Sequence, residues 1–280
     1  HEYGSLSGAK EAVAAVGRKM ATDGIAESLQ PLVCGFAGYG NVSQGAQEIF
    51  DLLPTKEISP DRLLANGDAF KQAHLGDLAC TAYKVVFKEQ HLVRPKDGSR
   101  QFALQDYYDH PEHYEGIFES YLGGLTVLMN CIYWEKKYPR LLSKRWIKNA
   151  FGGEKKPRLR VVGDVSCDRE GAIEATVKTT QPDDPVFVYD AEKQDAQMGF
   201  AGEGLAILAV DNLPCELSKE ACEAFSAALK PFVSALSRAK MQGTLSECDL
   251  PPEMKRALIL FRGELTPSFS YMKKFLHLQH

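Results

Sequence analysis

The fold of this chain is decided by one stretch of its sequence, Leu32-Val-Cys-Gly-Phe-Ala-Gly38-Tyr-Gly40-Asn-Val-Ser-Gln-Gly45-Ala-Gln-Glu-Ile-Phe50. A short apolar run ends there at a glycine-rich turn, and a helical pattern follows at once. Apolar residues recur at helical spacing at Ala46, Ile49, Phe50 and Leu53. A strand, a tight turn and a helix in this order are typical of a site for the pyrophosphate of a dinucleotide. The turn lets the backbone approach the phosphates, and the first N–H groups of the helix favour negative charge.

The turn departs from the usual three-glycine fingerprint at one position. Gly38 and Gly40 fill the first two positions, and Ser43 stands where the third glycine is usual. Because serine is small enough for a helix to pack closely on a strand, the pattern still indicates nucleotide binding. It is not a Walker A loop, since Ala46 and Gln47 occupy the places of its Lys and Ser/Thr. An ordinary βα turn is the alternative.

Composition limits the class of protein. The 280 residues, 44% of them hydrophobic, can bury the core of one large or two modest domains. The balance of 33 Lys+Arg against 37 Asp+Glu gives no basic footprint for nucleic acid or a membrane surface. No apolar run approaches the ~20 residues of a membrane helix. Seven cysteines without a C-x-x-C pair predict reduced thiols in an intracellular protein, cytoplasmic or in the mitochondrial matrix.

Three later apolar runs end in aspartate: Leu159–Asp164, Val186–Asp190 and Leu205–Asp211. Continuous rather than alternating apolar strands indicate burial on both faces, as in a parallel sheet covered by helices. The sequence therefore predicts an α/β, Rossmann-like, doubly wound and mostly parallel sheet with flanking interdomain helices. In such sheets ligands lie beyond the carboxyl ends of the strands, so at least one of these aspartates is expected at the site. A helix cap or turn role is the alternative for each.

The choice between NAD and NADP stays open at this level. Thr55–Ile58 reads as a brief second strand, and Glu57 lies 19 residues beyond Gly38, where an acidic residue would hold a ribose 2′-hydroxyl. Lys56 and Arg62 lie beside it and could instead meet a 2′-phosphate. A solvated surface charge is the alternative for Glu57.

The pattern predicts three segments. These are an interdomain helix segment at 1–30, a dinucleotide-binding Rossmann domain at 31–215, and a C-terminal helical segment at 216–280. The last would pack on the Rossmann domain or toward an absent substrate domain. Both ends of the chain read as cut, so we expect it to be part of something longer.

The remaining elements follow from periodicity. Tyr83–Phe87 reads as a strand, and residues 104–150 read as aromatic and mostly helical. A long helix is expected from Ser218, kinked at Pro231. Its predicted inner stripe consists of Ala221, Phe225, Ala228, Leu229, Phe232 and Leu236.

No metal site is expected. His110 and His113 lie three residues apart, but no acidic or cysteine partner completes a convincing set in the sequence. His91 follows a predicted strand and could touch the ligand crevice, although a packed or solvated histidine is the alternative. No cysteine stands in a recognisable arrangement with a histidine, and no complete acid–base set is present.

Several segments read together go beyond a generic dinucleotide-binding domain. They are Gly38–Phe50, His91–Arg94, His110–Tyr114, Ile132–Glu135 with Pro139–Leu142, Gly163–Ser166 with Asp168, and Val210–Pro214. In this order they resemble the lysine-ketoglutarate reductase part of the bifunctional aminoadipic semialdehyde synthases, which are relatives of saccharopine dehydrogenase and alanine dehydrogenase. The resemblance covers nearly the whole chain.

The resemblance implies an oxidoreductase acting on CH–NH donors in lysine degradation. Such an enzyme condenses L-lysine with 2-oxoglutarate and reduces the imine to saccharopine with NADPH, NADH remaining open. It also implies that this chain is the second half of the reductase. An N-terminal substrate domain of the same polypeptide would carry the acid–base lysine and histidine, so this chain alone is expected to be incomplete.

The site residues are carried over position by position. The resemblance gives Asp211 the place facing the nicotinamide and the incoming substrate, which makes it the catalytic candidate. The cofactor contacts that it implies are Gly38, Gly40, Asn41, Val42, Asp164, Val165, Ser166, Val210, Asp211, Asn212 and Leu213. Two alternatives stay open: a non-catalytic nucleotide-sensing module of the same fold, and an NAD-dependent saccharopine or alanine dehydrogenase.

Overall fold

The chain folds into two compact units, His1–Leu217 and Ser218–His280. The computed structural model describes residues 3–64, 78–153 and 156–276, and each unit is described by itself. The predicted division into three segments remains a prediction, and residues 1–2 and 277–280 of its first and last segments lie outside the described residues.

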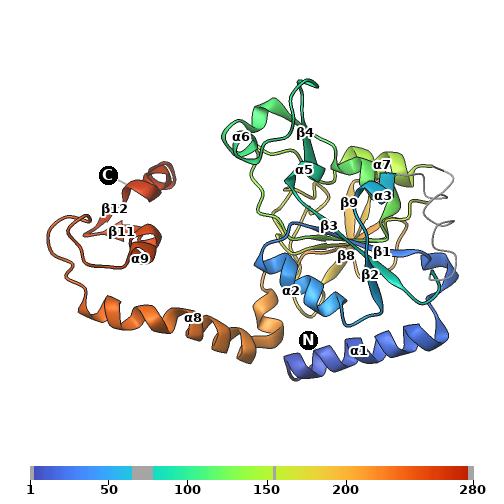
Figure 1. Ribbon diagram of the computed structural model, residues 1–280, viewed down its shortest axis with the longest axis horizontal. Coiled ribbons are helices and arrows are strands. Elements are labelled where there is room, and N and C mark those ends of the chain that lie inside the picture. The colour runs from blue at the N-terminus through green and yellow to red at the C-terminus, as the bar shows by residue number, and fades with distance from the viewer. Residues whose placement is uncertain (1–2, 65–77, 154–155, 277–280) are drawn as a thin grey trace. The chain divides into compact units, whose positions relative to one another are not determined.

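The first unit is built on an eight-stranded sheet with the order β2-β3-β1-β6-β7-β10-β8-β9 (Figure 1). The strands in this order are Thr55–Glu57, Ala82–Phe87, Leu32–Ala37, Val127–Asn130, Val161–Asp164, Leu205–Leu208, Val186–Asp190 and Asp195–Met198. The first six strands are parallel to one another, and β8 pairs in antiparallel orientation with both of its neighbours, β10 and β9. The predicted Rossmann-like, mostly parallel sheet is confirmed.

Helices cover both faces of this sheet. In Figure 1, α1 (Leu6–Asp23) and α2 (Asn41–Phe50) lie on one side and α7 (Lys144–Phe151) lies on the other. Ser43 of α2 is fully buried, which confirms that a small residue lets this helix pack closely. The core between the layers is aromatic and aliphatic and includes Phe36, Phe87, Phe118, Tyr121, Leu128, Val162 and Ile207.

One predicted parallel strand runs the other way. β8 pairs with β10 in antiparallel orientation, so Asp190 lies at the edge opposite to the carboxyl ends of the parallel strands. There its Oδ1 accepts the N–H groups of Glu192 (2.9 Å) and Lys193 (3.1 Å). Asp190 is therefore a turn residue, which is the alternative considered above, and it does not lie at the predicted ligand edge. Burial on both faces gives a continuous apolar run whatever the direction of the strand.

Residues 104–150 are not mostly helical. The segment contains short helices, α6 (Leu104–Asp109) and α7, and a central strand, β6. It also contains the 3₁₀ turns η2 (Pro111–His113) and η3 (Phe118–Gly124). The four residues of β6 are too few to show a strand period, and aromatic packing around them imitates a helical stripe.

The remaining elements of the first unit are short. They are η1 (Glu27–Leu29), α3 (Asp61–Leu64), α5 (Glu89–Leu92), the strand pair β4 (Val93–Pro95) and β5 (Tyr114–Gly116), and η4 (Leu213–Leu217).

The second unit consists of α8 (Ser218–Arg238), α9 (Pro252–Ala257), the pair β11 (Leu260–Phe261) and β12 (Glu264–Leu265), and η5 (Pro267–Phe275). The long helix from Ser218, with Pro231 inside it, is confirmed. Its inner stripe is not buried, since Phe225 is 67% exposed and α8 contains no buried residue. Amphipathic spacing predicts a face, but it does not supply a partner for that face. Across the described ranges, no helix is both long and apolar enough to cross a membrane.

Candidate functional site

The glycine turn after β1 has the geometry that its sequence requires. Gly38 has a φ of 98°, a left-handed conformation that side chains rarely adopt. A Cβ there would lie 3.1 Å from the carbonyl oxygen of Cys131, so the turn also packs directly against the end of β6. The N–H of Gly38 donates to the carbonyl of Phe87 (3.0 Å), which joins the turn to the end of β3.

The helix that follows begins without a cap. Gly40 is the N-cap residue of α2, and within the described part of the chain no side chain caps that helix. The first bond back to Gly40 comes from Gln44 (2.9 Å). Asn41 and Val42 in the first turn are exposed. The first N–H groups of α2 thus face an open surface, which suits an anion.

Asp164, at the end of β7, is a buried structural carboxylate. Its two oxygens accept hydrogen bonds from Asn130 Nδ2 (2.8 Å), the Thr176 hydroxyl (2.6 Å) and the N–H of Cys167 (3.1 Å). Burial raises its pKa, and these three donors oppose the rise. The side chain is committed inside the protein, so it holds the β7 loop rather than reaching outward.

The loop after β7 lies against the end of β6. The N–H of Val165 donates to the carbonyl of Asn130 (3.1 Å), and the Ser166 hydroxyl donates to the carbonyl of Ile132. Both residues are half-buried. The structure therefore brings residues 164–166 to the same sheet edge as the glycine turn.

Residues 210–213, which follow β10, lie at the same edge of the sheet. Val210 is buried, whereas Asp211 and Asn212 are exposed, and Leu213 begins η4. Asp211 is close enough to Cys167 to contribute to the raised pKa of that thiol, after burial and Asp164. The carboxylate of Asp211, unlike that of Asp164, is accessible.

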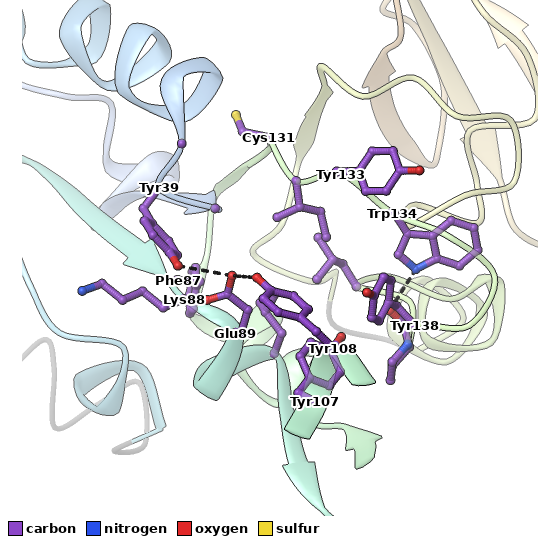
Figure 2. Close-up of a pocket in the computed structure, with 16 residues that line it drawn as sticks. Tyr39, Phe87, Lys88, Glu89, Tyr107, Tyr108, Cys131, Tyr133, Trp134 and Tyr138 are labelled. Carbon is purple, nitrogen blue, oxygen red and sulfur yellow. Dashed lines mark hydrogen bonds between the residues drawn. The ribbon is translucent and has the colours of Figure 1, made fainter. Parts of the chain in front are cut away.

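A pocket of about 440 Å³ opens beside the glycine turn (Figure 2). Its walls come from the carboxyl ends of β1, β3 and β6 and from α6. The connection after β1 leads to β2 on one side of it, and the connection after β3 crosses to β6 on the other side. Such a change of direction beside β1 is the usual place for a ligand in these folds. The lining is mainly apolar and aromatic, and it includes Phe87, Leu92, Tyr107, Tyr108, Ile132, Trp134 and Tyr138.

One carboxylate stands at this pocket. Glu89 Oε1 accepts hydrogen bonds from the hydroxyls of Tyr108 (2.8 Å) and Tyr39 (3.4 Å), so that Figure 2 shows it between the two phenols. Burial first and then Glu89 raise the pKa of Tyr108, which keeps that phenol a donor. Lys88 Nζ lies 5.7 Å from the centre of the Tyr39 ring.

Glu57 does not occupy the position expected for a ribose ligand. The second strand in sequence, β2, lies outside β3, so β3 rather than β2 is the neighbour of β1. Glu57 pairs in register with Lys84, three residues before the end of β3, and lies 3.6 Å from its ammonium. The acidic residue at the carboxyl end of the strand beside β1 is Glu89. The prediction for Glu57 was wrong because sequence spacing assumes the usual strand order.

The histidine and cysteine near the pocket have structural roles. His91 Nδ1 accepts the N–H of Lys88 (3.0 Å), and its ring meets that of Phe87 edge-on. Burial lowers the pKa of His91 and raises the pKa of Cys131 to about 11. The thiol is therefore neutral near pH 7 and is not an activated nucleophile.

Sequence reasoning missed the pocket residues after β3 and β6. The argument that singled out aspartates at strand ends applies equally to Glu89, which follows the predicted strand 83–87. The segment 131–134 had no such signal, since β6 itself was not predicted.

Fold and site together define a Rossmann-like α/β protein that has a glycine turn and a pocket at the carboxyl edge of its parallel strands. No family model matches the chain. The chain is 37% identical over 286 residues to the alpha-aminoadipic semialdehyde synthase of Arabidopsis thaliana, covering 97% of this chain and 25% of that protein. It is 31% identical over 287 residues to the mitochondrial alpha-aminoadipic semialdehyde synthase of Mus musculus, covering 98% of this chain and 30% of that protein.

A shorter similarity points to a second group of proteins. The chain is 29% identical over 129 residues to the NAD(+), L-lysine-forming saccharopine dehydrogenase of Emericella nidulans, covering 43% of this chain and 30% of that protein. The resemblance found in the sequence is confirmed: the chain is homologous to one region of the alpha-aminoadipic semialdehyde synthases. It spans between a quarter and a third of the length of these relatives.

Proposed function

We propose that this chain binds a nicotinamide dinucleotide and forms the coenzyme-binding half of a lysine-ketoglutarate reductase. The observation that carries the proposal is the uncapped start of α2 behind the Gly38 turn, beside an aromatic pocket at the same sheet edge. Homology to the synthases supports the choice of the lysine-ketoglutarate reductase reaction.

The adenosine end would occupy the aromatic pocket. A flat base gains from the apolar walls, and the diphosphate would then reach the N–H groups at the start of α2. Glu89 stands where a carboxylate can accept a ribose hydroxyl, and it would do so by exchanging or sharing its bonds to Tyr39 and Tyr108.

The nicotinamide end would lie along the loops after β7 and β10. Asp164 would keep Val165 and Ser166 in place, and the backbone of Val210 to Leu213 would border the ring. Asp211 is an accessible carboxylate there, suited to orienting a cationic amine of the substrate. We therefore assign it to positioning the substrate.

The proposed reaction condenses an amine of L-lysine with the keto carbon of 2-oxoglutarate, releasing water, and reduces the resulting imine to saccharopine by addition of a hydride and a proton. The coenzyme supplies the hydride. The chain's own residues bind and orient the coenzyme and form one wall of the site. Proton transfer would fall to groups in the substrate domain of the same polypeptide, so this chain alone should turn over slowly or not at all.

NADPH is the proposed coenzyme, as the resemblance implies, and two local charges decide how strongly it is preferred. Lys88 offers a cation for a 2′-phosphate, whereas Glu89 favours a free 2′-hydroxyl. Similarity to an NAD(+) saccharopine dehydrogenase makes NADH the alternative.

Calorimetric titration of the chain with NADPH and with NADH tests the proposal. We expect one site, and tighter binding of NADPH than of NADH. Absence of heat with both nucleotides would contradict coenzyme binding. Rapid saccharopine formation from lysine, 2-oxoglutarate and NADPH by this chain alone would contradict its role as one half of the enzyme.

A further inference from the structure

Although the sequence predicted no metal site, three side chains that can ligate a metal ion meet on an exposed turn outside the proposed coenzyme site. They are His110, Glu112 and His113, at the end of α6 and in η2. His110 Nδ1 and His113 Nε2 lie 3.6 Å and 3.9 Å from Glu112 Oε1. All three ligand atoms lie within 4.8 Å of one another, and the two imidazole rings are stacked 5.1 Å apart.

The backbone of this turn is fixed on both sides. The N–H of His113 donates to the carbonyl of His110 (3.0 Å), and the N–H of Lys96 donates to the carbonyl of His113 (2.9 Å). The ammonium of Lys96 also donates to the carbonyl of Glu112 (2.8 Å). Pro111 between them is buried. The three side chains are thus exposed, but they project from a constrained backbone, so little order is lost when they converge.

We propose that His110, Glu112 and His113 bind one divalent transition-metal ion, with zinc as the best match. Two imidazole nitrogens and one carboxylate oxygen form a ligand set that zinc uses with an open fourth position. A set with two nitrogen donors disfavours calcium and magnesium, which prefer oxygen. Bonds of about 2.0–2.2 Å in a tetrahedral site place ligand atoms roughly 3.4 Å apart. The two distances to Glu112 are already near that value.

The proposed metal site connects η2 to α6, the helix that contributes side chains to the aromatic pocket. α6 contributes Tyr107 and Tyr108 to the aromatic pocket, and its last turn ends at His110. A metal ion held between His110 and η2 would fix the end of that helix. The metal site itself needs no nucleotide, so it can be tested separately from the proposed function.

The test is calorimetric titration of the full chain with zinc chloride, without nucleotide. Imidazole is a common metal ligand, so variants at other histidines are needed as matched controls. The double variant H110A/H113A should lose the site, and Glu112→Gln should weaken it at least about tenfold. The double variant H277A/H280A and the variant Glu115→Gln, which alters a neighbouring carboxylate paired with Arg94, should keep it.

Two results would overturn the proposal. One is unchanged zinc affinity in H110A/H113A or in Glu112→Gln. The other is loss of binding in H277A/H280A. X-ray absorption at the zinc edge gives a second readout that does not depend on variants: two imidazoles and an oxygen ligand support the site, and fewer than two imidazoles contradict it.

Discussion

The two halves of the candidate site are built differently, although they share one sheet edge. Around β1 and β3 the glycine turn and aromatic side chains form a preshaped, largely apolar pocket. Around β7 and β10 one buried carboxylate, Asp164, ties loops together, and the accessible groups are polar. The first half suits recognition of a ligand by shape. The second leaves a polar surface open, which suits the substrate and the substrate domain of the proposed function.

The largest effect should come from breaking the turn. Gly38→Val forces a β-branched residue into a left-handed backbone conformation and places its Cβ 3.1 Å from the carbonyl oxygen of Cys131. We expect a loss of about 2–3 kcal/mol of stability and at least about tenfold weaker nucleotide binding. Gly45→Ala is the matched control, because nothing lies within 4 Å of its Cβ and alanine favours a helix. Urea unfolding and nucleotide titration measure both; equal behaviour of the two variants would contradict the prediction.

Next in size is loss of the carboxylate that holds the second half. Asp164→Ala leaves two buried donors, Asn130 and Thr176, and the half-buried N–H of Cys167 without their acceptor, and we expect a loss of about 3 kcal/mol in the free energy of unfolding. Asp190→Ala removes two exposed turn bonds and should cost at most about 1 kcal/mol. A comparable loss of unfolding free energy in both variants would contradict the structural role assigned to Asp164.

The same residue predicts a pH dependence. Burial raises the pKa of Asp164, so the native state holds the proton more tightly than the unfolded state. The contribution of this group is most favourable at low pH. It declines as pH rises from the ordinary aspartate pKa through the raised one, and then stays constant. The difference in unfolding free energy between the wild type and Asp164→Asn, measured across this range, should show that slope; a flat difference would contradict it.

A smaller effect separates the two coenzymes in the first half. Glu89→Gln should weaken NADH about tenfold by removing a charged acceptor for a ribose hydroxyl. NADPH should be unaffected or bound more tightly, since a carboxylate beside a phosphate repels it. Lys88→Met should weaken the binding of NADPH and leave that of NADH unchanged or tighter. Equal changes for both nucleotides in Glu89→Gln would place Glu89 away from the ribose.

The smallest effect concerns the phenols that hold Glu89. Tyr108→Phe removes a 2.8 Å bond to this carboxylate and should change nucleotide affinity by about twofold to tenfold. Tyr39→Phe, whose bond is 3.4 Å long, should change it less. A larger change in Tyr39→Phe would mean that the hydroxyl of Tyr39 contacts the nucleotide itself.

The sequence by itself determined the local units. It predicted the strand, turn and helix at residues 32–50, the mostly parallel α/β class, the helix from Ser218 and the resemblance that the homologues confirm. Each depends on a period or motif contained in one short segment, or on several such segments in order.

Only the tertiary structure decided how these units pair. Because β3 lies between β1 and β2, Glu89 rather than Glu57 follows the strand beside β1, and the reversed direction of β8 places Asp190 at the far edge. That residues after β6 and on α6 form the walls of the pocket was also evident only from the tertiary structure. Hydrogen bonds between strands join residues distant in sequence, and side-chain periodicity is the same for a strand in any position or direction.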